Sequence, residues 1–151
     1  MNKQIFAVIT AVLLSFSAFA QEKSGIQFTE GQWMQAVKKA RAENKLIFMD
    51  AYTSWCGPCK MLKSQVFPNK TLGDFYNKNF VNVAFDMEVG EGPQLANIYR
   101  VQAYPTMFFI DPNTGKVVKQ TLGYQEVDDL LKVAKSAVES MPMAAAKKKG
   151  K

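Results

Sequence analysis

The chain has 151 residues, 48% of them hydrophobic, and a formal charge of +6 at pH 7, with two cysteines and no histidine. Four lysines among the last five residues carry most of that charge, and residues 21–146 have a net charge of only +1, so nucleic-acid binding by the body of the protein is excluded. Without histidine or a second cysteine pair, zinc-finger, zinc-ribbon and haem-attachment sites are excluded too, and we expect no metal and no cofactor.

The first twenty residues have the three parts of a secretory signal. Lys3 gives a charged start, an apolar stretch follows over residues 5–19, and Ala18 and Ala20 form a small-residue cleavage site. The stretch is interrupted by two serines and is shorter than the roughly 20 residues that span a bilayer, which disfavours an uncleaved anchor. We therefore expect residues 1–20 to be removed after Ala20 and the protein to be exported.

The rest of the chain predicts one domain and a tail. About 130 residues remain after cleavage, enough for a single domain with its own core, and we expect that domain over residues 21–140. Residues 141–151 are rich in Ala and Lys with little to bury, which indicates a disordered basic tail.

The domain begins with an extended segment, a helix and a strand. The segment covers residues 26–28 and is followed by Thr29, which is suited to cap a helix ending near Asn44. Residues 46–51 are apolar apart from Asp50 and predict a buried strand.

The two cysteines come directly after this strand and open a second helix. We expect this helix over residues 56–67, with Met61, Leu62 and Val66 on its buried side, and the Pro68-Asn69 pair ends it.

Six further elements complete the domain. They are a helix over residues 71–77, a strand over 80–87, a short helix over 93–99, a strand over 106–111, a hairpin partner over 116–122 and a last helix, Val127–Glu139. The order βαβαβαββα predicts an α/β fold.

Both cysteines lie in the sequence Trp55-Cys56-Gly57-Pro58-Cys59, spaced so that the two sulfurs can close on each other. Such a bridge closes a very small loop and restrains the unfolded chain little, so a dithiol that carries electrons explains it better than a structural bridge. A redox-inert bridge in a binding module and a thiolate pair that holds Cu(I) remain as alternatives, the copper site being weakened by the lack of Met or His at ligand spacing.

Taken together, these features resemble the thioredoxin superfamily over residues 26–140. The motif Trp55-Cys56-Gly57-Pro58-Cys59-Lys60 is as thioredoxins have it, Tyr104-Pro105-Thr106 falls where that family keeps its cis-proline loop, Asp50 falls where it keeps a buried acid, and Gly123 falls beside the family's active site. The resemblance implies a thioredoxin-like fold with a central mixed β-sheet flanked by helices. It also implies that the redox-active disulfide Cys56–Cys59 works without a cofactor.

Details around the motif are similar to secreted thioredoxin-like proteins of Gram-negative bacteria, which implies a periplasmic location. Tyr52-Thr53-Ser54 precedes the motif as in that subgroup. Two departures from ordinary thioredoxins are the missing proline early in the helix after the cysteines and a longer loop over residues 88–92. The lysine that thioredoxins place opposite the buried acid is also missing, with Asn82 nearest to its position.

Cys56 is expected to be the attacking sulfur. At the first turn of a helix, unpaired backbone N–H groups and the helix dipole stabilise its thiolate. Cys59, one turn further on and expected to be more buried, would then resolve the mixed disulfide. Asp50 is the expected proton acceptor for Cys59, because burial in an apolar strand raises the pKa of a carboxyl group. The alternative for Asp50 is a hydrated acid at a strand end.

The substrate site is expected around the proline loop. A cis Pro105 would bring the backbone of Tyr104 alongside the cysteines, where it can pair with an extended substrate segment. Trp55 is expected to form part of the docking surface, with a hydrophobic shield for the strand end as the alternative. The resemblance adds Gly57-Pro58, Thr106 and Gly123 to this surface, and Gly57-Pro58 implies a reducing character.

These observations favour an exported protein-disulfide reductase, most simply a monomer, that receives electrons from a membrane protein. An oxidase or isomerase uses the same chemistry in the other direction, and the sequence leaves the direction open.

Overall fold

The computed structural model describes residues 24–29 and 32–141. The predicted signal peptide and all but the first residue of the predicted tail lie outside them. Within the described residues a four-stranded sheet has the strand order β2-β1-β3-β4. The strands are β1 (Leu46–Tyr52), β2 (Phe80–Asp86), β3 (Thr106–Ile110) and β4 (Val117–Leu122). β1 pairs with β2 in parallel and with β3 antiparallel, and β3 pairs antiparallel with β4, so the sheet is mixed as predicted.

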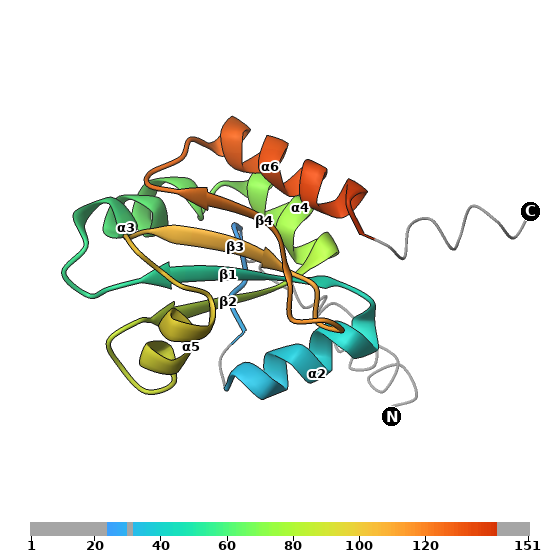
Figure 1. The fold of residues 1–151 in the computed structure, drawn as a ribbon. Coiled ribbons are helices and arrows are strands. Elements are labelled where there is room, and N and C mark those ends of the chain that lie inside the picture. The colour runs from blue at the N-terminus through green and yellow to red at the C-terminus, as the bar shows by residue number, and fades with distance from the viewer. Residues whose placement is uncertain (1–23, 30–31, 142–151) are drawn as a thin grey trace, which may run out of the picture.

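Helices cover both faces of this sheet (Figure 1). One face carries α2 (Trp33–Glu43) and α5 (Gly92–Ile98). The other carries α4 (Lys70–Asn79), α6 (Val127–Glu139) and the helix that follows the cysteines, which is made of α3 (Gly57–Met61) and the π-helical turn η1 (Leu62–Val66). The three-layer architecture confirms the predicted fold class.

Alternation along β1 divides the core in two. Leu46 and Phe48 belong to the cluster under α4 and α6, whereas Ile47 and Met49 belong to the cluster under α2 and α5. Because side chains in a strand point to opposite faces in turn, Asp50 lies on the same face as Phe48, the face of the helix that starts at the cysteines.

The start of the domain differs from the prediction. Phe28 makes a single parallel bridge to Asn82 in place of a strand, and the N–H of Thr29 donates to the carbonyl of Asn82 at 2.8 Å. Thr29 is therefore held in this extended segment, and the prediction that it caps α2 is wrong. The helix begins at Trp33, whose N–H donates instead to a carboxylate oxygen of Glu91, 2.8 Å away.

In the helix after the cysteines, the prediction that Met61 is buried is wrong. Leu62 and Val66 are buried as predicted, but 43% of Met61 is exposed. The buried side of this helix is Cys59, Leu62 and Val66, a spacing of three and four residues, and Met61 falls between the members of that row.

In the described part of the chain no helix is both long enough and apolar enough to cross a membrane.

Candidate functional site

The two cysteines form a disulfide at the start of α3, with an S–S distance of 2.06 Å and 5.3 Å between their Cα atoms. Cys56 is the N-cap of the helix, and its sulfur accepts a hydrogen bond from the backbone N–H of Cys59 at 3.2 Å. An N-cap acceptor satisfies one of the free N–H groups of a helix start, and a thiolate in that position is stabilised by the same donors.

Both sulfur-bearing residues are buried in this oxidised state. Cys56 is 3% exposed and Cys59 is 5% exposed, so the prediction that Cys59 is the more buried of the two is wrong. The N–H of Cys56 donates to the carbonyl of Thr53 at 3.2 Å, and this turn folds Cys56 back toward the end of β1. The difference between the two cysteines is therefore their place on the helix, not their burial.

Asp50 lies in the middle of the sheet and is 5% exposed. In register it pairs with Ala84 of β2 and Met107 of β3, so its immediate neighbours on both sides carry no charge. Burial raises the pKa of its carboxyl group to about 7, and the charge of Lys63 opposes that rise. Asn82, the residue nearest to the missing lysine's position, pairs with Phe48, and the β2 residue opposite Asp50 is the uncharged Ala84.

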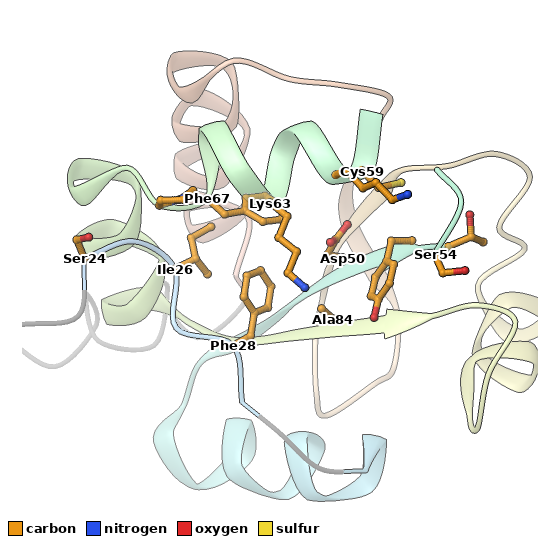
Figure 2. Close-up of a pocket in the computed structure, with 13 residues that line it drawn as sticks. Ser24, Ile26, Phe28, Asp50, Ser54, Cys59, Lys63, Phe67 and Ala84 are labelled. Carbon is orange, nitrogen blue, oxygen red and sulfur yellow. The ribbon is translucent and has the colours of Figure 1, made fainter. Parts of the chain in front are cut away.

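A cavity of about 560 Å³ joins the acid to the second cysteine (Figure 2). It lies between the first helix turns after the cysteines, the end of β1 and the extended segment at the start of the domain. Asp50, Cys59 and Lys63 line it, together with the apolar side chains of Phe28 and Phe67. A carboxyl group with a pKa near neutral and the second cysteine therefore border the same cavity.

Trp55 is held at the rim of the site although 64% of it is exposed. Its indole N–H donates to both carboxylate oxygens of Glu88 at 3.1 Å. Its ring meets the ring of Tyr104 edge-on, with 5.9 Å between the centroids. These contacts join the cysteine motif to the proline loop and to the longer loop after β2.

The Tyr104–Pro105 peptide bond is cis, as expected. Thr106 pairs with Ala51 at the end of β1, which places the proline loop at the sheet edge from which the chain runs to Cys56. The N–H of Gly123 donates to the carbonyl of Pro105 at 2.8 Å, and Gly123 has φ 80°, a value that favours glycine. Gly123 therefore lies beside this loop, in agreement with its predicted position.

The remaining predicted residues divide into exposed and buried groups. Gly57 and Pro58 are exposed at the helix start, where a partner can reach them. Thr106 is 6% exposed, and its hydroxyl donates to the carbonyl of Ala103 at 2.7 Å. The side chain of Thr106 thus holds the proline loop closed, and it does not face outward as a docking residue would.

Three residues of the site did not follow from sequence reasoning. Glu88 is separated from Trp55 by 33 positions, and no local pattern links them. The hydroxyl of Thr53, 1% exposed, has no hydrogen-bond partner among the described residues. Lys63 follows Cys59 by four residues, the spacing that places two side chains on one helix face, and this signal could have been found.

Within residues 24–29 and 32–141, no group of three or more Cys, Asp, Glu or His side chains is placed to hold a metal ion.

Comparison with known proteins gives consistent matches. A family model described as a thioredoxin-like domain matches residues 33–137. Thioredoxin H4 of Arabidopsis thaliana is 33% identical over 109 residues, which are 71% of this chain and 84% of that protein. The solution structure of a candidate disulphide-isomerase from Bacteroides thetaiotaomicron is 44% identical with a TM-score of 0.69, covering 80% of this chain and 98% of that one. A thioredoxin from Thermus thermophilus, 20% identical, has the same fold with a TM-score of 0.70 over 80% of this chain and 93% of that one.

Proposed function

The chain belongs to the family of thioredoxin-like proteins, which work through a redox-active disulfide, and from this membership and the site geometry we propose that it reduces protein disulfides. The observation that carries the proposal is the Cys56–Cys59 pair at a helix start, with the buried acid Asp50 on the same cavity as Cys59. The two cysteines supply the electrons and the acid supplies a proton acceptor.

The reaction has two exchange steps. The thiolate of Cys56 attacks a sulfur of the substrate disulfide, which forms a mixed disulfide and releases the first substrate thiolate. Cys59 then loses its proton and attacks the sulfur of Cys56, which releases the second substrate thiolate and closes the Cys56–Cys59 bridge. The substrate gains two electrons and the enzyme dithiol loses two.

Asp50 takes the proton of Cys59 in the second step. A carboxyl group with a pKa of about 7 is partly ionised at neutral pH, so it can accept a proton and release it again without a large energetic cost. Burial is what gives Asp50 this property, because a carboxyl group in water has a pKa of 3.8 and would be a weaker base.

The substrate docks at the rim formed by Trp55 and the proline loop. Trp55 and Tyr104 offer ring surface beside the helix start that carries Cys56. The backbone of the proline loop offers hydrogen-bonding groups to an extended segment, a mode of recognition that depends little on substrate sequence.

The place of action that we propose is outside the cytoplasm, in the periplasm of a Gram-negative bacterium. The signal-like residues 1–20 support export, and an oxidising compartment means that the dithiol needs a donor, for which a membrane protein is the simplest source. N-terminal sequencing of the protein recovered after export tests this placement, with Gln21 as the expected first residue. A chain recovered intact from Met1 would contradict it.

Disulfide isomerisation is a second candidate, favoured by the description of the Bacteroides thetaiotaomicron relative. The same dithiol would attack a wrong disulfide and leave after a rearrangement inside the substrate. Recovery of scrambled ribonuclease activity, compared with insulin reduction at equal enzyme concentration, separates the two. Faster action on ribonuclease than on insulin would replace the reductase proposal with this one.

The direct test of reduction uses insulin as substrate and dithiothreitol as electron donor. Cys56→Ser is expected to lose turnover completely, because it removes the nucleophile. Cys59→Ser keeps the nucleophile and is expected to accumulate a mixed disulfide that gel electrophoresis resolves. Ser64→Ala, on the exposed side of the same helix, is the control and should keep full turnover. Turnover that survives Cys56→Ser would rule out the mechanism.

A further inference from the structure

The cavity beside Asp50 and Cys59 reaches the surface at a lysine. Lys63 lines the cavity and is itself exposed, so the space it borders is open to solvent on that side. Figure 2 shows the side chain of Lys63 extending from the helix toward Phe28 and Ala84. Ala84 is the register partner of Asp50, so the lysine reaches toward the strand pair that carries the acid.

Two buried polar atoms on this cavity have no hydrogen-bond partner among the described residues. They are Oδ1 of Asp50 and the hydroxyl of Thr53, on residues that are 5% and 1% exposed. An unpaired buried carboxylate oxygen is costly, and water is the usual partner in such a place. A cavity of about 560 Å³ with these polar atoms on its wall has room for several waters, which would join Asp50 to the ammonium group of Lys63.

Lys63 lines the cavity because of its position on the helix relative to Cys59. Lys63 lies four residues after Cys59, and residues four apart share one face of a helix. The helix then widens into the π-helical turn closed by the N–H of Phe67 and the carbonyl of Leu62, at 2.8 Å. Lys63 is therefore carried by the element that carries the resolving cysteine, and on the side that faces the cavity.

We propose that Lys63 is a positioning residue whose ammonium group, acting through cavity water, favours the carboxylate form of Asp50 and keeps it able to accept the proton of Cys59. This inference rests on the proposed function. In the step concerned, the S–H bond of Cys59 breaks and the proton moves to Asp50, then to cavity water and to solvent. The electron pair stays on the Cys59 sulfur, which forms the disulfide.

The other charged and titratable groups around the cavity do not replace Lys63. Lys60 also lines it, but the opposing influence on the Asp50 pKa comes from Lys63. Tyr52, at the end of β1, has its pKa raised by burial and by Asp86 and Asp50, so it stays neutral near pH 7. The described residues of the extended segment, 24–29, contain no charged side chain, and the β3 neighbour of Asp50 is Met107.

The test is a carbon-13 NMR titration of the Asp50 carboxyl group in protein expressed from the full chain. Lys63→Met keeps the apolar stem and removes the charge, and we expect Asp50 to titrate higher by about one pH unit. Lys63→Arg keeps the charge and should restore the original titration. Lys60→Met is the matched control: it removes the same charge from the same helix and should move the titration much less. Lys63→Gln serves in the same comparison if Lys63→Met does not fold.

A second readout follows the resolving step. In single-turnover release of substrate from the mixed disulfide, the rate should increase with pH. The pH at which it does so should be higher in Lys63→Met, by the same amount as the shift in the Asp50 titration. At pH 7 this corresponds to a rate roughly fivefold lower in Lys63→Met, because the ionised fraction of Asp50 falls by that factor for a shift of about one unit.

An Asp50 titration that is the same in Lys63→Met and in the unchanged protein would overturn the inference. An equal shift in Lys63→Met and Lys60→Met would also overturn it, because the effect would then be a general loss of positive charge. The titration uses no substrate, so the two proposals can fail separately. If Asp50 titrates as before in Lys63→Met and the protein reduces insulin, only the role of Lys63 is ruled out. If the titration of Asp50 shifts but the protein does not reduce insulin, the pairing of Lys63 with Asp50 is supported and the proposed reductase is ruled out.

Discussion

Phe48 and Asp50 lie two residues apart on the same face of β1, and their surroundings are opposite. The ring of Phe48 is fully buried among the rings of Phe28, Phe67, Tyr76 and Phe109, with centroid distances of 4.8 to 6.3 Å. Asp50 is almost as buried, yet it borders a cavity and keeps a carboxylate oxygen without a protein partner. On this face of β1, Phe48 is closely packed, whereas Asp50, two residues later, borders open space.

Burial alone therefore does not define the role of a residue on this face. Burial of Phe48 removes apolar surface from water and stabilises the fold. Burial of Asp50 acts against stability when the group is ionised, and it gives the carboxyl group the raised pKa that the proposed proton transfer from Cys59 requires.

The largest effect is expected for Phe48→Ala. Removing a fully buried ring from an aromatic cluster costs about 3–5 kcal/mol in the free energy of unfolding, from lost burial and from the void that remains. Denaturation in urea measures it. Met34→Ala, at a side chain that is 64% exposed, is the control and should change stability by less than ~0.5 kcal/mol. A loss below ~1 kcal/mol at Phe48 would mean that this part of the face is not closely packed.

Asp50→Asn is expected to raise the free energy of unfolding at high pH, the opposite of the effect of Phe48→Ala. The pKa is 3.8 in water and about 7 in the fold, so the folded state binds more protons than the unfolded one between those values, and stability falls as pH rises through that window. Replacing the acid by a neutral amide should therefore stabilise the protein above about pH 7, by at most about 4 kcal/mol. The gain should disappear below about pH 4.

Thermal unfolding at pH 8 and pH 4 measures this difference. Asp74→Asn, at an exposed acid paired with Lys70 on α4, is the matched control and should show little of the pH-dependent gain. The same Asp50→Asn protein should resolve mixed disulfides about 10²-fold more slowly. A protein that is less stable at pH 8 than the original would mean that Asp50 is held by a compensating partner.

The smallest effect is expected at the rim, for Glu88→Ala. It removes the acceptor of the Trp55 indole N–H but leaves the edge-on contact with Tyr104. We expect KM for a protein disulfide to rise about two- to fivefold with kcat nearly unchanged, as for the loss of one exposed hydrogen bond. Glu139→Ala, at the far end of α6, is the control. A fall in kcat without a change in KM would place Glu88 in the chemistry and not in docking.

Much of this structure could be predicted because its signals are local. The apolar run before the cysteines gave β1 to within one residue, since a buried strand has few polar positions, and Asp50 was conspicuous within it. The last helix was predicted at its observed bounds from one apolar face. The cysteine pair stands in one short motif, and the cis proline was expected from the resemblance of Tyr104-Pro105-Thr106 to the proline loop of thioredoxins.

What failed depends on contacts between distant segments. Thr29 has the chemistry of a helix cap, but its N–H pairs with β2, and the helix start takes its acceptor from Glu91, 58 residues from Trp33. The hydrogen bond from Trp55 to Glu88 likewise joins two residues that are 33 positions apart. Lys63 is a different case, because its spacing of four residues from Cys59 was visible in the sequence and only its place on the cavity of Asp50 required the structure.

The most direct test of disulfide reduction by this protein is the reduction potential of the Cys56–Cys59 pair, equilibrated with glutathione and dithiothreitol buffers of known ratio. A dithiol that reduces protein disulfides should have a potential near −270 mV, at the reducing end of roughly −270 to −120 mV for proteins of this type. A value near −120 mV would mean that the disulfide is the reactive state and that the protein donates bridges, which contradicts a reductase.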